Sequence, residues 1–195
     1  MTRATSYRSF QRTTVLLLGL LISAAAVHAD TYTIGTSNFT GNGNFGTVTT
    51  TLVGNTIQVD VPLAPGFVIH SAGVGFNVVN PDAGVAMSDF SPHYSAGSTN
   101  RSFDGFGKFE FSAASDETPS SARVHGTNTA MFTVSRTGGF SNANQLAEAN
   151  SGGWYFGIQV APIDANLATG FFAAGPGGVT VTSNTTWGRI KSLYR

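Results

Sequence analysis

Short segments with alternating apolar and polar residues constrain this chain more than any other feature of its sequence. Residues 47–53 (TVTTTLV) place valine and leucine on one face of an extended chain and threonine on the other. Residues 56–61 (TIQVDV) alternate in the same way, and the turn pair Gly54-Asn55 lies between the two segments. Because side chains along a β-strand point alternately to its two faces, each segment has the pattern of a half-buried strand. Together the two segments predict a β-hairpin.

Further segments of this kind follow along the chain, separated by turn residues. They predict strands at residues 73–80, 130–136, 154–160, 169–175 and 178–183. Residues 142–149 (NANQLAEA) instead predict about two helical turns, with Asn142 as the N-cap. Many short strands, dense turns and at most one short helix favour an all-β fold. Within that class the pattern is typical of an antiparallel β-sandwich or a jelly roll.

The phenylalanine-rich stretch SFDGFGKFEFS has two interpretations. Phe109 and Phe111 alternate with polar residues, which predicts that both rings lie on one face of a half-buried strand. Phe103 and Phe106 precede this strand across a glycine-rich turn. The rings could form an exposed platform for a ligand or one wall of the core. We expect the core, because the chain has no cysteines and burial of each ring contributes about 1.5–3 kcal/mol.

The first 29 residues have the parts of a secretory signal peptide. Three arginines precede an apolar run at residues 15–27 (VLLLGLLISAAAV), and small residues follow it. We therefore expect cleavage between Ala29 and Asp30. The alternative is a retained membrane anchor, but the run is shorter than the roughly 20 apolar residues that a spanning helix needs. The product is expected to be secreted, and thus extracellular or periplasmic.

Cleavage would leave 166 of the 195 residues, which suits one domain. We assign residues 30–183 to the β-sandwich domain and residues 184–195 to a linker and basic tail. Seven basic and ten acidic residues remain after cleavage, a net charge of −3. Because no basic patch is present, nucleic acid and anionic membranes are not expected as partners. The absence of cysteine excludes disulfides, thiol catalysis and cysteine metal sites.

Charged residues make up only 10% of the chain, against roughly 25% in ordinary domains. The surface must therefore consist largely of serine, threonine, asparagine and glycine, and such a surface is compatible with polysaccharide or other surface proteins as partners. A carbohydrate-binding module is the alternative function. It would need aromatic rings exposed on one face, and the candidate ligand-binding residues are Tyr155, Phe171 and Trp187.

No pattern in the sequence indicates catalysis or a cofactor. His70, His93 and His125 are widely spaced, so we expect separate histidines on surface loops and no metal site. Asp116-Glu117 lies in the polar segment SDETPSS, which predicts solvated loop charges. A glycoside hydrolase that uses the nearby carboxylates Asp104 and Glu110 is a less favoured alternative. We expect a protein that is not an enzyme and has no cofactor.

Residues 44–79 (NFGTVTTTLVGNTIQVDVPLAPGFVIHSAGVGFNVV) resemble bacterial exported proteins of the PEP-CTERM type, which are sorted to the surface by an exosortase. The similar features continue in MFTVSRTGGF and in GGWYFGIQVAPIDANLATGFFAAG, and they cover most of residues 31–182. The resemblance implies a non-enzymatic component of the cell surface or extracellular matrix, associated with exopolysaccharide and biofilm.

In that family a Val-Pro-Glu-Pro-like motif, an apolar helix and an arginine-rich end follow the domain. The present sequence reads TTWGRIKSLYR at the corresponding place. Two expectations remain open from this difference. The protein is either a freely secreted relative, or its reading frame is truncated and the sorting motif lies in another frame downstream.

Overall fold

The computed structural model describes residues 28–125 and 128–175, and it confirms the all-β antiparallel fold class. The predicted strand at 178–183 and the predicted linker and tail at 184–195 lie outside these described residues. Of the predicted signal peptide, only His28 and Ala29 are described, and both belong to the first strand. Among the described residues, no helix has the length and apolar character needed to span a membrane.

Twelve strands and two short helices make up the described chain. In chain order they are β1 (His28–Ser37), β2 (Thr47–Val53), β3 (Thr56–Pro62), β4 (Phe67–Phe76), β5 (Ala86–Ser88), β6 (Tyr94–Ala96), β7 (Arg101–Phe103), β8 (Gly107–Phe109), β9 (Phe111–Ser115), α1 (Pro119–His125), β10 (Thr129–Ser135), the 3₁₀ helix η1 (Ala143–Leu146), β11 (Phe156–Pro162) and β12 (Gly170–Ala174).

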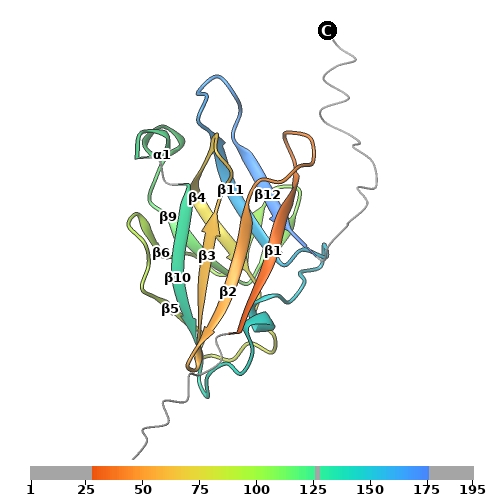
Figure 1. The fold of residues 1–195 in the computed structure, drawn as a ribbon, viewed down its shortest axis with the longest axis vertical. Helices are drawn as coiled ribbons and strands as arrows, with labels where there is room; N and C mark the ends of the chain where they lie inside the picture. Colours follow the sequence, from red (N-terminus) through yellow and green to blue (C-terminus); the bar gives the residue numbers. More distant parts are fainter. Residues whose placement is uncertain (1–27, 126–127, 176–195) are drawn as a thin grey trace, which may run out of the picture.

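Ten of the strands form one sheet, in the order β5-β10-β3-β2-β1-β12-β11-β4-β9-β6. Strand β1 joins its two halves, because residues 28–33 pair with β2 and residues 34–37 pair with β12 across a bulge. The sheet folds back on itself at this strand into two facing layers (Figure 1). Strands β5 and β6, at the two ends of the order, come into contact, so the sheet is nearly closed.

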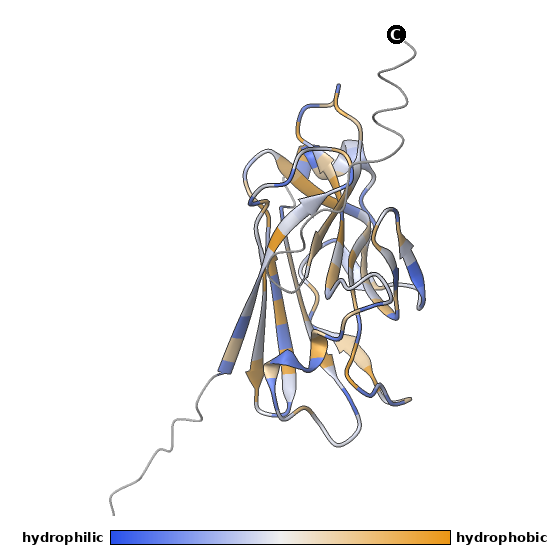
Figure 2. Ribbon diagram, turned by 90° about the vertical axis from the view of Figure 1, so that its right-hand side faces the viewer, coloured by the Kyte–Doolittle hydropathy of each residue, from blue (hydrophilic) through white to orange (hydrophobic). Residues whose placement is uncertain are grey.

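The main core fills the space between the layers. Strands β2, β3 and β10 turn one face inward and one outward, as the alternating sequence predicts, and Figure 2 shows the changing hydropathy along the strands. Phe132 of β10 stacks on Phe76 of β4, with ring centroids 5.6 Å apart, and thus joins the two layers. The largest fully buried side chains of this core are Phe76, Phe132, Phe156, Phe172, Ile34, Ile57, Ile69, Leu146, Ile158 and Val48.

A second, smaller core lies outside the two layers. The hairpin β7–β8 packs over β4 and β11 and buries Phe103, Phe106 and Phe109, which confirms the core interpretation of these rings. The expectation that Phe109 and Phe111 share one face of a single strand is wrong. The chain leaves one sheet for another at residue 110, so Phe109 enters the outer core whereas Phe111 packs against the main core and stacks on Phe76.

The predicted hairpin at residues 47–61 is confirmed as β2–β3, and the strands predicted at 130–136, 154–160 and 169–175 are confirmed with small shifts as β10, β11 and β12. The strand predicted at 73–80 is the second half of β4, which ends at Phe76. The helix predicted at 142–149 is only the 3₁₀ helix η1. Its N-cap is Asn142, as expected, and Gln145 completes a capping box.

Candidate metal centre

Helix α1 forms part of the only cluster of three potential metal ligands in the described residues. Its N-terminus is capped by Thr118, whose hydroxyl accepts a hydrogen bond from the Ser121 N–H at 3.2 Å. Pro119 occupies the first helical position, where a missing N–H costs nothing. Ala122 then packs against the end of the sheet, and the Arg123 side chain donates to the Pro162 carbonyl oxygen at 2.6 Å. These contacts fix the direction in which the last turn of α1 projects.

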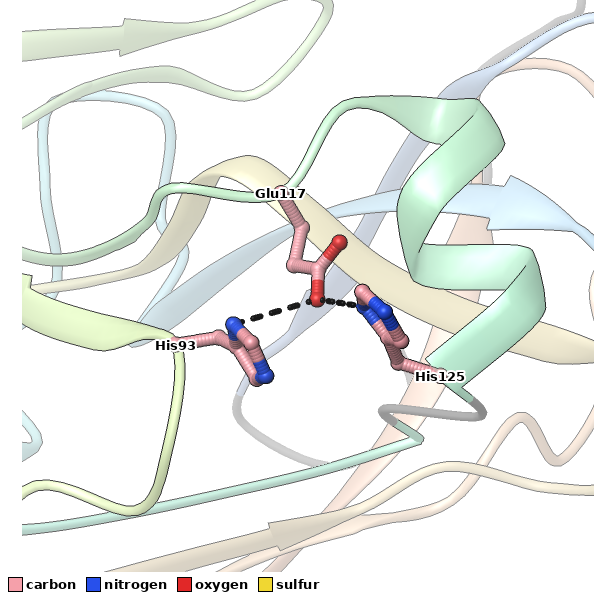
Figure 3. Close-up of side chains that lie close together, drawn as sticks. All are labelled: His93, Glu117 and His125. Carbon is pink, nitrogen blue, oxygen red and sulfur yellow. Dashed lines mark hydrogen bonds and ion pairs between the residues drawn. The ribbon is translucent and has the colours of Figure 1, made fainter.

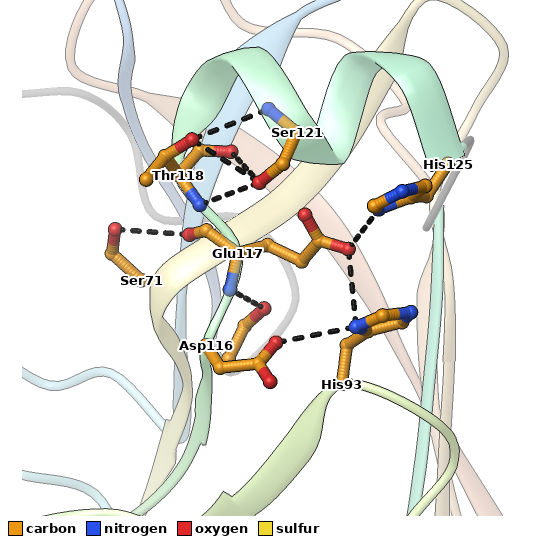
Figure 4. Close-up of polar contacts among 8 residues, drawn as sticks. Ser71, His93, Asp116, Glu117, Thr118, Ser121 and His125 are labelled. Atoms are coloured by element: carbon orange, nitrogen blue, oxygen red, sulfur yellow. Dashed lines mark hydrogen bonds and ion pairs between the residues drawn. The ribbon is translucent and has the colours of Figure 1, made fainter.

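Glu117 precedes this helix, and its backbone is held from both sides. Its carbonyl oxygen accepts hydrogen bonds from the N–H of Ser71 in β4 at 3.0 Å and from the Ser71 hydroxyl at 3.3 Å. Its own N–H donates to the Ser115 hydroxyl at 3.1 Å. The Glu117 backbone is therefore held by the strands β4 and β9 (Figure 4).

Two histidines from other elements face the Glu117 carboxylate. His125, at the C-terminal end of α1, places its Nδ1 2.5 Å from Glu117 Oε1. His93, in the turn before β6, places its Nδ1 3.3 Å from the same oxygen. The two imidazole rings are nearly parallel, with centroids 5.0 Å apart (Figure 3). We call these three residues the His–Glu–His cluster.

The carboxylate of this cluster is buried, whereas its two histidines are accessible. The Glu117 side chain is 2% exposed, compared with 38% for His93 and 47% for His125. Oxygen Oε2 of Glu117 is buried and has no hydrogen-bond partner. The nearby Ser121 hydroxyl and the two imidazoles lower the pKa of Glu117, against the effect of burial, which would raise it. The neighbours of this carboxylate therefore favour its ionised form despite its burial.

Two neighbours complete the polar surroundings of the cluster. The exposed Asp116 carboxylate lies 3.3 Å from His93 Nδ1 (Figure 4). The Tyr94 hydroxyl is buried without a hydrogen-bond partner, and burial, with a smaller contribution from the Glu117 charge, raises the pKa of Tyr94. In the described part of the chain, the ion pairs all join a histidine to a carboxylate, so no lysine or arginine neutralises Glu117.

Several expectations from the sequence are wrong at this site. Glu117 is not a solvated loop charge, because its backbone is held on Ser71 and its side chain is 2% exposed and in contact with His93 and His125. His93 and His125 are exposed, as expected, but they are not separate, because the fold brings their elements together. His70 is not on a surface loop. It lies in β4, is 2% exposed, and burial lowers its pKa.

The ligands of the cluster come from three elements, so their spacing in the sequence carries no signal. One local signal was present. Thr118 and Pro119 have the residue types of an N-cap and a first helical position, and they indicate a helix in the segment that we interpreted as a polar loop.

The aromatic residues proposed for ligand binding do not form a shared exposed platform in the described residues. Tyr155 is half-buried and packs edge-to-face on Tyr32, with ring centroids 5.6 Å apart. Phe171 is half-buried against the outer core and makes the same kind of contact with Phe103. Trp187 lies outside the described residues. Every aromatic ring in the described part of the chain is at least partly buried.

The two carboxylates considered for hydrolysis lie around the hairpin β7–β8. Asp104 is exposed in its turn, where its carbonyl oxygen accepts a hydrogen bond from the Asn38 side chain. Glu110 is partly buried, and its Oε2 lies 3.5 Å from the Val78 N–H. No ion pair or hydrogen bond links either carboxylate to the His–Glu–His cluster.

Comparison of the chain with protein-family models, with curated proteins and with solved structures finds no match in any of the three.

Proposed function

We propose that this protein is an exported, non-enzymatic β-sandwich component of the cell surface or extracellular matrix, and that it contacts exopolysaccharide. The observation that supports the proposal is the outer face of the layer formed by β5, β10, β3, β2 and the first half of β1. We call it the threonine face. The expected signal peptide and the resemblance to PEP-CTERM proteins point to the same compartment.

Hydroxyl groups cover the threonine face in register across the strands. Thr31 in β1 lies opposite Thr49 in β2, and their hydroxyl oxygens are 3.4 Å apart. Gln58 in β3 has Thr51 of β2 opposite it on one side and Thr133 of β10 opposite it on the other. None of the hydroxyl-bearing residues of this face is buried: Thr31, Thr33, Thr47, Thr49, Thr51, Thr56, Ser88, Thr129, Thr133 and Ser135.

The threonine face is almost free of charge. The strand pairing places one ionisable side chain on this face, Asp60. Burial raises the pKa of the Asp60 carboxyl. A neutral hydroxyl surface can exchange hydrogen bonds with the hydroxyls of a neutral or weakly charged polysaccharide without a large desolvation cost. Each contact is weak, so many aligned contacts along a polymer are needed for useful affinity.

A co-sedimentation assay tests this proposal. The purified protein is mixed with exopolysaccharide from the producing strain and, separately, with cellulose. We expect the wild-type protein to sediment with the exopolysaccharide. The triple variant Thr49→Val, Thr51→Val, Thr133→Val keeps the shape of the face but removes three hydroxyls. At about 1 kcal/mol for each lost hydrogen bond, it should bind at least about tenfold more weakly.

The matched control is the double variant Thr99→Val, Thr169→Val, which changes two exposed threonines outside the threonine face. It should sediment like the wild type. Failure of the wild-type protein to sediment, or equal loss in the two variants, would overturn the proposed function. Sedimentation with cellulose alone would show that the face recognises a different polymer from the one proposed.

A further inference from the structure

We propose that the His–Glu–His cluster binds one divalent transition-metal ion, for which Zn²⁺ is the probe, and that the ion fastens α1 to the turn before β6. This inference is independent of the proposed function, because the cluster and the threonine face have no residue in common. It rests on the donor atoms, on the burial of the carboxylate between two accessible imidazoles, and on the elements from which the ligands come.

The donor set selects the class of metal. Two imidazole nitrogens and one carboxylate oxygen are ligands that zinc and its neighbours in the first transition row accept in proteins. Calcium and magnesium prefer sites made of six or more oxygen ligands, which the cluster does not provide. With three protein ligands, a fourth position stays open to water, and the exposure of His93 and His125 gives the ion a path from solvent.

The second observation that points to a cation is the burial of the Glu117 carboxylate, which is 2% exposed and whose Oε1 faces both imidazoles (Figure 3). A carboxylate buried in this way is costly unless positive charge or hydrogen-bond donors lie beside it. No lysine or arginine pairs with this carboxylate in the described chain. A divalent ion between Glu117 and the two imidazoles would supply the missing positive charge.

The distances require only small side-chain movements. Ligand atoms on a tetrahedral zinc ion lie about 3.3 Å apart, because each is about 2.0–2.1 Å from the metal. The three ligand atoms already lie within 4.8 Å of one another, and the separation between His93 Nδ1 and Glu117 Oε1 is 3.3 Å. The hydrogen bond between His125 and Glu117 would be replaced by the two metal bonds. Because the two rings are nearly parallel, one must rotate to direct its lone pair at the shared ion.

The ligands tie together three segments of the chain. His93 has a φ of 71°, in the left-handed region that residues other than glycine seldom adopt. Its carbonyl oxygen accepts a hydrogen bond from the Asp116 N–H at 3.0 Å. Such conformations persist where the surrounding structure holds them, and they are frequent at functional sites. An ion bound only by the folded arrangement of His93, Glu117 and His125 would stabilise that arrangement by mass action.

The experiment measures Zn²⁺ binding by isothermal titration calorimetry after treatment of the full purified protein with a chelator. We expect saturable binding of one ion per chain and a rise in the melting temperature on addition of Zn²⁺, with no rise on addition of Mg²⁺. His125→Ala and His93→Ala should each weaken Zn²⁺ binding by about tenfold or more and abolish the thermal shift. Glu117→Gln should do the same.

Two controls separate loss of a ligand from loss of the fold. Glu148→Gln removes one exposed carboxylate elsewhere and should bind Zn²⁺ like the wild type. His125 is exposed at the end of its helix, so His125→Ala should keep the wild-type circular dichroism spectrum even if Glu117→Gln unfolds. Absence of Zn²⁺ binding by the wild type, or unchanged binding in both histidine variants, would overturn the proposal.

Discussion

Gly75 and Gly157 face each other on the neighbouring strands β4 and β11, and each leaves room for a phenylalanine ring of the outer core. A Cβ atom added at Gly157 would lie 2.6 Å from Phe109 Cε2, and one added at Gly75 would lie 2.5 Å from Phe103 Cε2. Glycine weakens a strand, but at this pair it allows the hairpin β7–β8 to approach the sheet. The outer core thus depends on two residues that have no side chain.

We expect Gly157→Ala to destabilise the protein by about 1–3 kcal/mol, because the added methyl group must displace two buried rings. Urea unfolding monitored by tryptophan fluorescence measures this change. Gly41→Ala is the matched control, since a Cβ atom there meets nothing within 4 Å, and its unfolding midpoint should stay near that of the wild type. A midpoint for Gly157→Ala equal to that of the control would contradict this account of the outer core.

At the residue scale, alternation predicted which side chains of β2, β3 and β10 face the core, because each of these strands is covered on one face only. It could not predict that Glu117 is buried. The burial of that carboxylate depends on contacts with Ser71 and with His93, which are distant in sequence. The local sequence around Glu117 does not indicate such contacts.

At the element scale, the side chain of Asn150 holds the hairpin β7–β8 against the turn before β11. Its Nδ2 donates to the carbonyl oxygens of Phe106 at 2.8 Å and Lys108 at 3.2 Å. Its Oδ1 accepts from the N–H groups of Gly152 at 2.9 Å and Trp154 at 3.1 Å. One side chain therefore satisfies four backbone groups in two segments that are far apart in the sequence.

Asn150→Asp should loosen this connection, because an aspartate has no N–H to donate and places a negative charge beside two carbonyl oxygens. We expect a loss of about 1–3 kcal/mol in stability and faster amide exchange in β7 and β8, measured by hydrogen–deuterium exchange. Asn42→Asp makes the same charge change at an exposed position and should leave exchange in the hairpin unchanged. Equal exchange in all three proteins would refute this role of Asn150.

The elements with strong alternation were predicted from the sequence, whereas those fixed by a few side-chain contacts were not. The hairpin β2–β3 is bounded by a turn pair and has a buried face, so both its type and its register follow from the sequence. Helix α1 has only seven residues and one buried side chain, Ala122, so it lacks an apolar periodicity. The break between β8 and β9 occurs inside a continuous alternating pattern, which concealed it.

At the scale of the whole molecule, the fold class was predicted, but the pairing of the strands was not, apart from the hairpin β2–β3. Most ladders of the large sheet join strands that are distant in the sequence, such as β1 with β12 and β3 with β10. These pairings depend on how all the apolar faces can be buried together. A single sequence indicates which face of each strand is apolar, but it does not indicate which other strands that strand pairs with or packs against.

A further prediction at this scale concerns export of the protein. If the signal peptide is removed before Asp30, β1 loses the pairs that His28 and Ala29 make with β2 but keeps those of residues 30–33. We therefore expect the exported protein to start at Asp30 and to stay folded, as checked by intact-mass spectrometry of the culture medium and circular dichroism. Replacement of the small residue at the cleavage position by Ala29→Lys should block processing. An exported chain that still carries residues 1–29 would rule out this cleavage.

The short strands at the two ends of the large sheet have a consequence for how copies of this protein can associate. Exposed strand edges act as templates on which other chains add, and this growth leads to fibrils. Here β5 and β6 have three residues each and come into contact, so they leave little open backbone on which another copy could dock. The large sheet thereby offers few places for edge-to-edge polymerisation.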